Sequence, residues 1–395
     1  MRLHLVLAFF IPVLVQAADA ANDWIGYRGP RGTGVFPQER PPAHPTVLWR
    51  VPLANWGNAS PVAVGGAVFV LNEIGWKHDF PLLQCFDAAS GALRWEKELD
   101  HLSSTALGAA EQQKLRQAWH EVMAWFREAY AARALCDDGK YAEGRAAWKA
   151  IGCEAPATEA PITGYMFRAV KPTEDCVAAR HRKMLEANGL IYESWRHTLN
   201  LGNGVGNIGH AYPTPVSDGQ RLYVATAFDA FWCLDSGGTV VWSTVVPGNR
   251  AGDFCSRAKS PILYHDLFIS DLNGLVRALD RKTGAVRWTA ATSQGEYMTI
   301  VTPVVIRVGS TDVLLCGGID SASAPTLHAF QLPMGRPLVV SGWRNCGGMM
   351  LVRDDQPDTV FFTGGGEHGG WVKKGQGEHP PTAAVRFALD GTTLT

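Results

Sequence analysis

The sequence predicts an all-β fold: a β-propeller of four-stranded antiparallel blades with an α-helical insertion. Three observations predict it. A hairpin motif that ends in Trp returns with a period of 46 residues, as from Trp49 to Trp95 and from Trp242 to Trp288, which is the length of one propeller blade. Gly and Pro are frequent, at 42 and 23 of 395 residues, as many short strands separated by turns require. The 14 Trp residues give each repeat a large aromatic side chain to bury.

The hairpin motif has the form Asp-x3-Gly-x3-Trp. It occurs at 87–95 and 280–288, and a copy that is one residue shorter before its glycine occurs at 235–242. Asp caps the turn, Gly takes a positive-φ position, and the next strand carries Trp. Ser-Pro or Thr-Pro opens two further strands in each unit, at 60–61, 214–215, 260–261 and 302–303. Each unit therefore has four expected strands, with proline where its missing N–H costs little.

About five units are expected, and two interpretations of the ring stay open. The fourth unit is degenerate, because Gly335 is in register but Gln331 and Val339 stand where Asp and Trp are expected. The fifth, around 359–363 and 384–390, stops just short of its Trp. Trp49 lies in a segment typical of an outermost strand and could close a five-blade ring. We favour the alternative, an incomplete ring.

Four segments organise the chain. Residues 1–20 are typical of a signal peptide, with Arg2 before an apolar run from Leu5 to Val15 that is too short to span a bilayer. Residues 21–100 hold an N-terminal segment and the first blade, 101–202 a helical insertion, and 203–395 the further blades. We expect an exported monomer without a membrane span, periplasmic or secreted. The 36 basic and 37 acidic side chains exclude a disordered chain and give no electrostatic case for nucleic acid.

The insertion contains one strong helical pattern. Leu115, Trp119, Val122, Phe126 and Tyr130 fall on one face of a helix expected over about 106–130. Shorter helices are expected at 141–151 and 176–190. The favoured interpretation is a helical cap over one propeller face rather than a separate catalytic domain, although binding of a partner stays open.

The eight cysteines allow two interpretations. An even number in an exported protein suits disulfides, but a chain of 395 residues can build its core without them. Several could equally be small buried apolar residues. The sequence gives no pairing.

These repeats resemble the pyrroloquinoline-quinone-like repeat family of eight-bladed propellers, which includes quinoprotein alcohol dehydrogenases and the propeller component of outer-membrane protein assembly. The resemblance covers 23–100 and 203–395. The opening at 23–34, DWIGYRGPRGTG, also resembles that of many secreted bacterial members, with Tyr27 in place of Phe. The resemblance implies that Trp95, Trp242 and Trp288 dock against the neighbouring blade and hold the blades together, and we assign Trp49 the same role.

The family also implies a catalytic alternative, a dehydrogenase that uses pyrroloquinoline quinone with calcium. That quinone is a tricarboxylate, so its site needs cations, calcium ligands and an acidic base. The dehydrogenases place a disulfide between adjacent cysteines above the ring, but this sequence has no Cys-Cys dipeptide and no C-x-x-C-H haem motif. No catalytic residue can be carried over, so the cofactor is implied by resemblance alone.

Two other motifs are weak. Residues 204–209 fit G-x-G-x-x-G, but they run into prolines rather than a helix, so a blade-entry loop is favoured over a nucleotide site. Glu367 and His368 are weak metal candidates, since no fixed spacing supports them and a solvated loop is favoured.

Topology places a set of aromatic, amide and basic side chains near one axial face, where they could hold an anionic or carbohydrate-like ligand. Ordinary loop hydrogen bonding and channel filling is the favoured alternative. We therefore predict a non-catalytic scaffold that binds a ligand or a protein. The alternatives are a quinone-dependent alcohol or sugar dehydrogenase with an atypical site and a structural surface protein. The funnel candidates are Trp56, Asn58, His210, Tyr212, Arg257, Lys259 and Tyr297.

Overall fold

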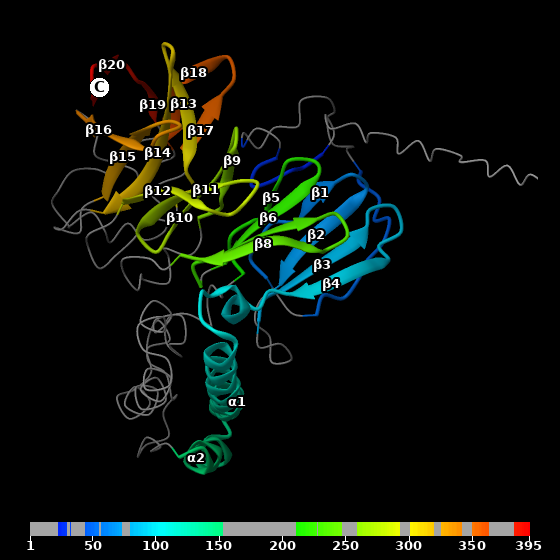
Figure 1. The fold of residues 1–395 in the computed structure, drawn as a ribbon. Coiled ribbons are helices and arrows are strands. Elements are labelled where there is room, and N and C mark those ends of the chain that lie inside the picture. Colours follow the sequence, from blue (N-terminus) through cyan, green and yellow to red (C-terminus); the bar gives the residue numbers. More distant parts are fainter. Residues whose placement is uncertain are drawn as a thin grey trace, which may run out of the picture.

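Successive antiparallel sheets lie side by side in chain order (Figure 1). The innermost strands of neighbouring sheets contact one another, β1 with β5, β5 with β9 and β13 with β17, so the sheets are arranged radially about an axis. The predicted all-β propeller with a helical insertion is confirmed. The computed structural model describes residues 23–29, 32, 44–54, 57–72, 80–152, 211–226, 228–246, 259–292, 301–319, 325–341, 350–362 and 383–395.

Blades 1 to 3 share one plan, in which four consecutive strands pair antiparallel in chain order. The third strand of each blade is almost fully buried, whereas the outermost strand of blade 1 is exposed along nearly its whole length. Proline precedes each innermost strand, as predicted. Blade 1 comprises β1 (Val62–Val64), β2 (Ala67–Asn72), β3 (Leu82–Asp87) and β4 (Leu93–Glu98); blade 2 comprises β5 (Val216–Ser217), β6 (Arg221–Thr226), β7 (Ala230–Asp235) and β8 (Val240–Val245); blade 3 comprises β9 (Ile262–Tyr264), β10 (Leu267–Leu272), β11 (Leu275–Asp280) and β12 (Val286–Ala291).

Blades 4 and 5 depart from this plan near the end of the chain. Blade 4 has β13 (Val304–Val308), β14 (Thr311–Ile319), β15 (Pro325–Gln331) and β16 (Arg336–Val340). Blade 5 has three strands among the described residues rather than the expected four: β17 (Met350–Arg353), β18 (Gln356–Phe362) and β19 (Ala383–Arg386).

The last hairpin, β20 (Leu389–Asp390) and β21 (Thr393–Leu394), joins blade 4 instead. There β21 pairs in parallel with the outermost strand β16, with Val339 opposite Thr393. Val339 stands where other blades carry Trp, so β16 presents no indole to the glycine of this last hairpin, Gly391. The hairpin backbone satisfies its hydrogen bonds on the open edge of β16.

Aromatic and aliphatic side chains fill the spaces between blades. Between blades 2 and 3, Tyr223 and Phe231 pack on Phe268. Between blades 3 and 4, Ile269 and Phe330 belong to one buried cluster. The core is thus divided into layers between sheets, as radial packing requires.

The insertion begins with the short helix η2 (His101–Ser104) and continues with α1 (Ala109–Asp137) and α2 (Tyr141–Ala150). Helix α1 extends seven residues beyond the predicted end at Tyr130, because its last turns pack on α2. The predicted second helix is present, and the third, at 176–190, lies outside the described residues. Figure 1 shows α1 running away from the sheets with α2 at its far end, so these two helices form an arm rather than the expected cap. No helix in the described part of the chain is long and apolar enough to cross a membrane.

Candidate functional site

Each outer-strand tryptophan reaches the hairpin of the following blade. The indole N–H of Trp95 donates to the carbonyl of Ser236 at 3.0 Å, that of Trp242 to Arg281 at 3.0 Å and that of Trp288 to Pro333 at 2.8 Å. Trp49 does the same to Ala88 of blade 1 at 3.0 Å, although residues 45–50 form no strand.

The hairpin glycine lies directly beneath each indole. A Cβ on Gly284 would come within 2.6 Å of the Trp242 ring, and one on Gly335 within 2.3 Å of Trp288. Both glycines also have positive φ. The motif therefore requires glycine twice over, for backbone conformation and for room.

A second inter-blade link runs near the axis. In blades 2, 3 and 4 the hydroxyl of the residue before the innermost proline accepts a backbone N–H from the preceding blade: Ser60 N donates to Thr214 Oγ1, Thr214 N to Ser260 Oγ, and Ser260 N to Thr302 Oγ1, each at 3.1 Å. This role was not predicted from the sequence, although the first four units each carry a hydroxyl residue before their proline.

The N-terminal segment, residues 23–29, crosses the axial channel. Trp24 pairs with Ala63 of blade 1 through two backbone bonds, and the carbonyl of Ile25 accepts the N–H of Ser217 in blade 2. Arg28 then donates from Nη1 to the carbonyl of Met350 in blade 5 at 2.9 Å. The segment therefore joins the first two blades to the last.

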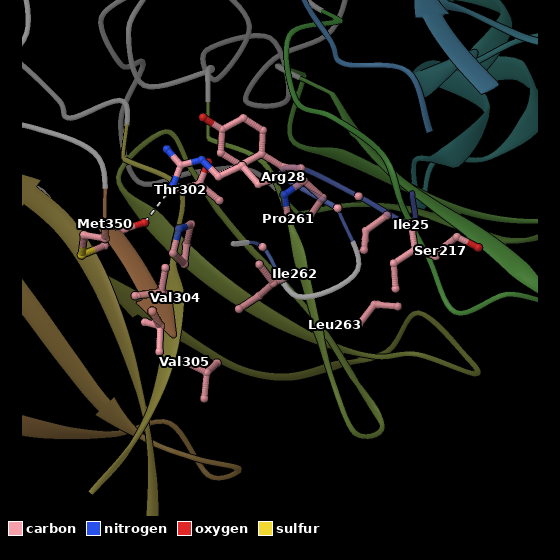
Figure 2. Close-up of a pocket in the computed structure, with 17 residues that line it drawn as sticks. Ile25, Arg28, Ser217, Pro261, Ile262, Leu263, Thr302, Val304, Val305 and Met350 are labelled. Atoms are coloured by element: carbon pink, nitrogen blue, oxygen red, sulfur yellow. Dashed lines mark hydrogen bonds between the residues drawn. The ribbon is translucent and has the colours of Figure 1, made fainter. Parts of the chain in front are cut away.

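An axial pocket of about 290 Å³ lies between this segment and the innermost strands of blades 2 to 5. Figure 2 shows Arg28 extending toward Met350 along one side, with Ile262, Val304 and Val305 on the walls. Seventeen described residues line it, of which Arg28 is the one with a charged side chain. They are Ile25, Gly26, Tyr27, Arg28, Gly29, Gly32, Val216, Ser217, Pro261, Ile262, Leu263, Thr302, Pro303, Val304, Val305, Met350 and Val352.

Blade 3 contains a buried charge cluster. Lys259 Nζ contacts Asp271 Oδ2 at 2.6 Å and the carbonyl of Gly317 in blade 4 at 2.8 Å. Thr292 donates to the other oxygen of Asp271 at 2.8 Å. The side chains of Lys259 and Asp271 are 1% and 0% exposed. Because burial removes both charges from water, each depends on the other for stabilisation.

A second ion pair joins blades 2 and 3. Arg277 Nη2 lies 2.8 Å from Asp229 Oδ1, and its other donors reach the carbonyls of Val246, Leu272 and Leu275. Burial lowers the pKa of Arg277, and the nearby carboxylate of Asp229 opposes that shift. These bonds hold the guanidinium between the two blades.

Among blades 1 to 4, the described residues place this charge cluster in blade 3 alone. The strand registers place Leu71, Ala225 and Gly317 at the position of Asp271, and Gln84, Trp232 and His328 at the position of Arg277. Lys259 corresponds to Ala59, Pro213 and Val301, each one residue before the Ser-Pro or Thr-Pro pair. These positions could not be predicted from the repeat, because blades 1, 2 and 4 do not repeat the charges.

Of the predicted funnel residues, three lie in the described part of the chain. Lys259 is enclosed in its ion pair, and neither Asn58 nor Tyr212 is among the described residues that line the axial pocket. Trp56, His210, Arg257 and Tyr297 lie outside the described residues, as do Glu367 and His368. Arg28 does line the axial pocket. In the sequence it stood out only as part of the motif at 23–34.

Four cysteines are described, Cys85, Cys136, Cys233 and Cys316, and all four are free and buried. Burial raises the pKa of Cys233 to about 11, so its thiol is a poor nucleophile. Cys85 and Cys233 occupy the same repeat position as Ala278. At this position cysteine serves as a small buried residue. The other four cysteines lie outside the described residues.

A family model with the description "Outer membrane protein assembly factor BamB" matches residues 42–127 and 190–323, which is more than half of the chain. The chain belongs to this family of pyrroloquinoline-quinone-like repeat propellers. The resemblance inferred from the repeats is confirmed. A comparison with curated proteins gives no significant match.

Solved structures of BamB and of quinohemoprotein alcohol dehydrogenases are similar to parts of the chain. BamB from Moraxella catarrhalis is 18% identical with a TM-score of 0.28, covering 38% of this chain and 43% of that one. A quinohemoprotein alcohol dehydrogenase from Pseudomonas putida is 18% identical with a TM-score of 0.31, covering 38% and 28%. Another, from Comamonas testosteroni, is 10% identical with a TM-score of 0.38, covering 85% and 43%. The chain spans less than half the length of each.

The described residues do not fit the quinone and calcium that some family members use. Those lining the axial pocket offer one cation to a tricarboxylate and no carboxylate side chain to a calcium ion. Within the described ranges, no group of three or more His, Cys, Asp or Glu side chains could hold a metal ion.

Proposed function

We propose that the protein is an exported, non-catalytic scaffold whose propeller holds a helical arm, η2 with α1 and α2, for a protein partner. The observation that carries this proposal is the way the arm is attached. Trp119 of α1 stacks on Phe80 of blade 1, with ring centroids 6.1 Å apart and planes 8° apart. It also meets Phe228 of blade 2 edge-on at 5.3 Å. The first half of the helix is therefore fixed to two blades at once.

Polar contacts fix the same junction. Asp100 caps η2 by accepting the N–H groups of Leu102 and Ser103, and it pairs with Arg116 of α1 at 2.7 Å. His101 is buried and stacks on Phe228 at 4.1 Å, and burial lowers the pKa of His101 to about 3. A neutral imidazole therefore fills this aromatic junction at physiological pH.

The far half of the arm is also well packed. A Cβ on Gly144 of α2 would approach Cys136 of α1, so the two helices are in close contact there. The indole N–H of Trp125 donates to the carbonyl of Ile151 at 3.2 Å. Helices α1 and α2 pack on each other, and α1 is fixed to the propeller at one end. Such a pair suits binding of another protein, because it is already ordered and loses little conformational entropy when the partner binds.

Two further observations support the proposal. The family description, an outer-membrane protein assembly factor, favours a protein partner and a periplasmic location. Residues 1–20 have the pattern of a signal peptide, which supports export. Cell fractionation with N-terminal sequencing tests export, and the expected mature chain begins after Ala17 or Ala20.

Site-specific photo-cross-linking in cells tests the scaffold. We expect one identified partner to cross-link from exposed positions of α1, Glu121 and Glu128, and not from Lys97 on the exposed strand β4. Replacing 101–202 by a short linker should abolish co-purification of that partner with the protein and leave a folded propeller. Tight stoichiometric binding of pyrroloquinoline quinone with calcium, together with dye reduction by an alcohol, would overturn the proposal in favour of a dehydrogenase.

A further inference from the structure

The axial pocket has the composition of a small-molecule site that does not depend on the helical arm. Its volume of about 290 Å³ is at the lower end of the range for ligand sites. Ile262 and Leu263 of blade 3, Val304 and Val305 of blade 4, and Met350 of blade 5 form the walls. A ligand that replaces water on these side chains must itself be largely apolar.

Arg28 supplies the charge in this pocket. Its guanidinium is positioned by the bond to the Met350 carbonyl and lies 4.9 Å from the centre of the Tyr27 ring. A positive charge beside apolar walls is screened less than one in water, and the planar guanidinium matches a carboxylate. One charged side chain among the described lining residues suits one anionic group on the ligand.

The backbone of Arg28 has a conformation that is unfavourable for a residue other than glycine. Its φ is 62°, in the left-handed region, and the next residue, Gly29, has a φ of 80°. Glycine at position 28 would adopt this conformation without cost. Of the three other described non-glycine residues with positive φ, Asp229 and Asn273 carry buried polar contacts between blades 2 and 3, and His265 lies in an exposed turn. Strained residues with polar side chains often mark functional positions.

Neighbouring residues of the same motif have structural roles. A Cβ on Gly29 would come within 2.9 Å of the Trp24 ring, and one on Gly26 within 3.1 Å of Val216. Trp24, Gly26 and Gly29 therefore fix the conformation of the segment by their packing. Arg28 differs from them, because its positive φ disfavours any residue other than glycine at that position.

We propose that the axial pocket binds a small, largely apolar monocarboxylate, a branched aliphatic or aromatic acid, and that Arg28 recognises its carboxylate. The inference goes beyond the scaffold function and does not rest on it. It concerns the channel between blades 2 and 5, whereas the scaffold function concerns the arm.

Calorimetric titration of the full-length protein with phenylacetate and isovalerate tests the proposal, with 2-phenylethanol as the uncharged analogue and pyrroloquinoline quinone as a tricarboxylate. We expect phenylacetate to bind at least about tenfold more tightly than 2-phenylethanol. Arg28→Gln and Arg28→Gly should lose this preference. Arg353→Gln, which removes an exposed arginine of blade 5, should retain it.

A pocket variant covers the case in which the Arg28 variants fail to fold. Val304→Phe leaves Arg28 in place but narrows the pocket, so it should weaken phenylacetate binding more than isovalerate binding. The proposal is overturned if neither acid binds the wild type, if the acid and alcohol bind equally, if a folded Arg28 variant keeps the preference, or if the quinone saturates the pocket through Arg28.

Discussion

A glycine beneath an indole sets how closely two blades approach one another. Gly284 lies under Trp242 with a φ of 74°, and no other residue type offers both the conformation and the space. Gly219 also has positive φ, 89°, but a Cβ there would meet nothing within 4 Å. The two glycines therefore separate the effect of backbone conformation from that of packing.

We predict that Gly284→Ala lowers the free energy of unfolding by about 2 to 4 kcal/mol, since it adds overpacking to backbone strain. Gly219→Ala should cost only about 1 kcal/mol, from strain alone. Urea unfolding of both variants, followed by Trp fluorescence, measures the difference. Equal losses would show that the indole moves away freely and that the close approach carries no energy.

The buried ion pair between Lys259 and Asp271 in blade 3 gives a second prediction for single residues. Asp271→Leu alone leaves the Lys259 ammonium buried without its carboxylate, and we predict a loss of about 3 to 5 kcal/mol. Adding Lys259→Met should recover most of that loss, because Leu71 and Val301 show that apolar side chains fit these positions in other blades. Denaturant unfolding of the two single variants and the double variant forms the cycle. A double variant no more stable than the worse single one would contradict this account.

At the scale of single residues, the sequence could predict those positions that recur in every complete repeat. The indoles, their glycines and the prolines recur with one period, so their positions could be inferred from the chain alone. Asp271, Arg277 and Lys259 occur once each and come together only through strand register. Arg28 meets Met350 across 322 residues, a distance along the chain that no local pattern spans.

The hairpin is the element that the motif specifies. In blade 3, Asp280 accepts the N–H groups of Lys282 and Thr283 and pairs with Arg287 at 2.6 Å. The bond from Arg287 is the main cause that lowers the pKa of Asp280 from 3.8 to about 2. The Arg287 side chain is 51% exposed and that of Asp280 is 13% exposed, so the pair lies at the surface and solvent screening keeps its contribution small.

The lowered pKa of Asp280 predicts how the stability of the fold changes with pH. A carboxyl group whose pKa is lowered by folding stabilises the protein above its unfolded pKa, and this stabilisation disappears as the pH falls from about 4 to about 2. Asp280→Asn retains an acceptor for the turn but not the charge. We expect wild type to be more stable than this variant at pH 6, with most of the difference lost at pH 2, as measured by thermal unfolding. A difference that persists unchanged at pH 2 would contradict the charge pairing.

The arm is the second element with its own test. Trp119→Ala removes a fully buried ring from the junction with blades 1 and 2, and we predict that limited proteolysis then cleaves α1 while the blades stay protected. Glu121→Ala, two residues away and exposed, is the control and should behave as wild type. Cleavage of blades and arm together in the Trp119 variant would show that the arm is part of the propeller core. The buried face predicted this helix, but its end at Asp137 depends on contacts with α2, which a single-helix pattern does not contain.

At the scale of the whole molecule, the blades are linked in one direction around the axis. The indole of Trp49 binds blade 1, and the outer-strand indole of each of blades 1 to 3 binds the hairpin of the next blade. The backbone bonds to the Ser and Thr hydroxyls near the axis join blades 1 to 4 in the same order. The series stops at Val339. A Cβ on Gly391 would meet nothing within 4 Å, so no ring among the described residues lies over this glycine.

This interruption predicts where the propeller opens first. In a repeat fold the stability of each unit depends on its contacts with its neighbours, so the amides of blade 5 should exchange with deuterium faster than those of blades 2 and 3. Val339→Trp should supply an indole to Gly391 and slow exchange in 383–395. Val241→Trp adds the same ring to an exposed position of β8 and should leave that exchange unchanged. Because both variants add one exposed indole, only a contact made at the last hairpin can separate them, and equal exchange in the two would mean that the missing tryptophan is not what leaves blade 5 weakly held.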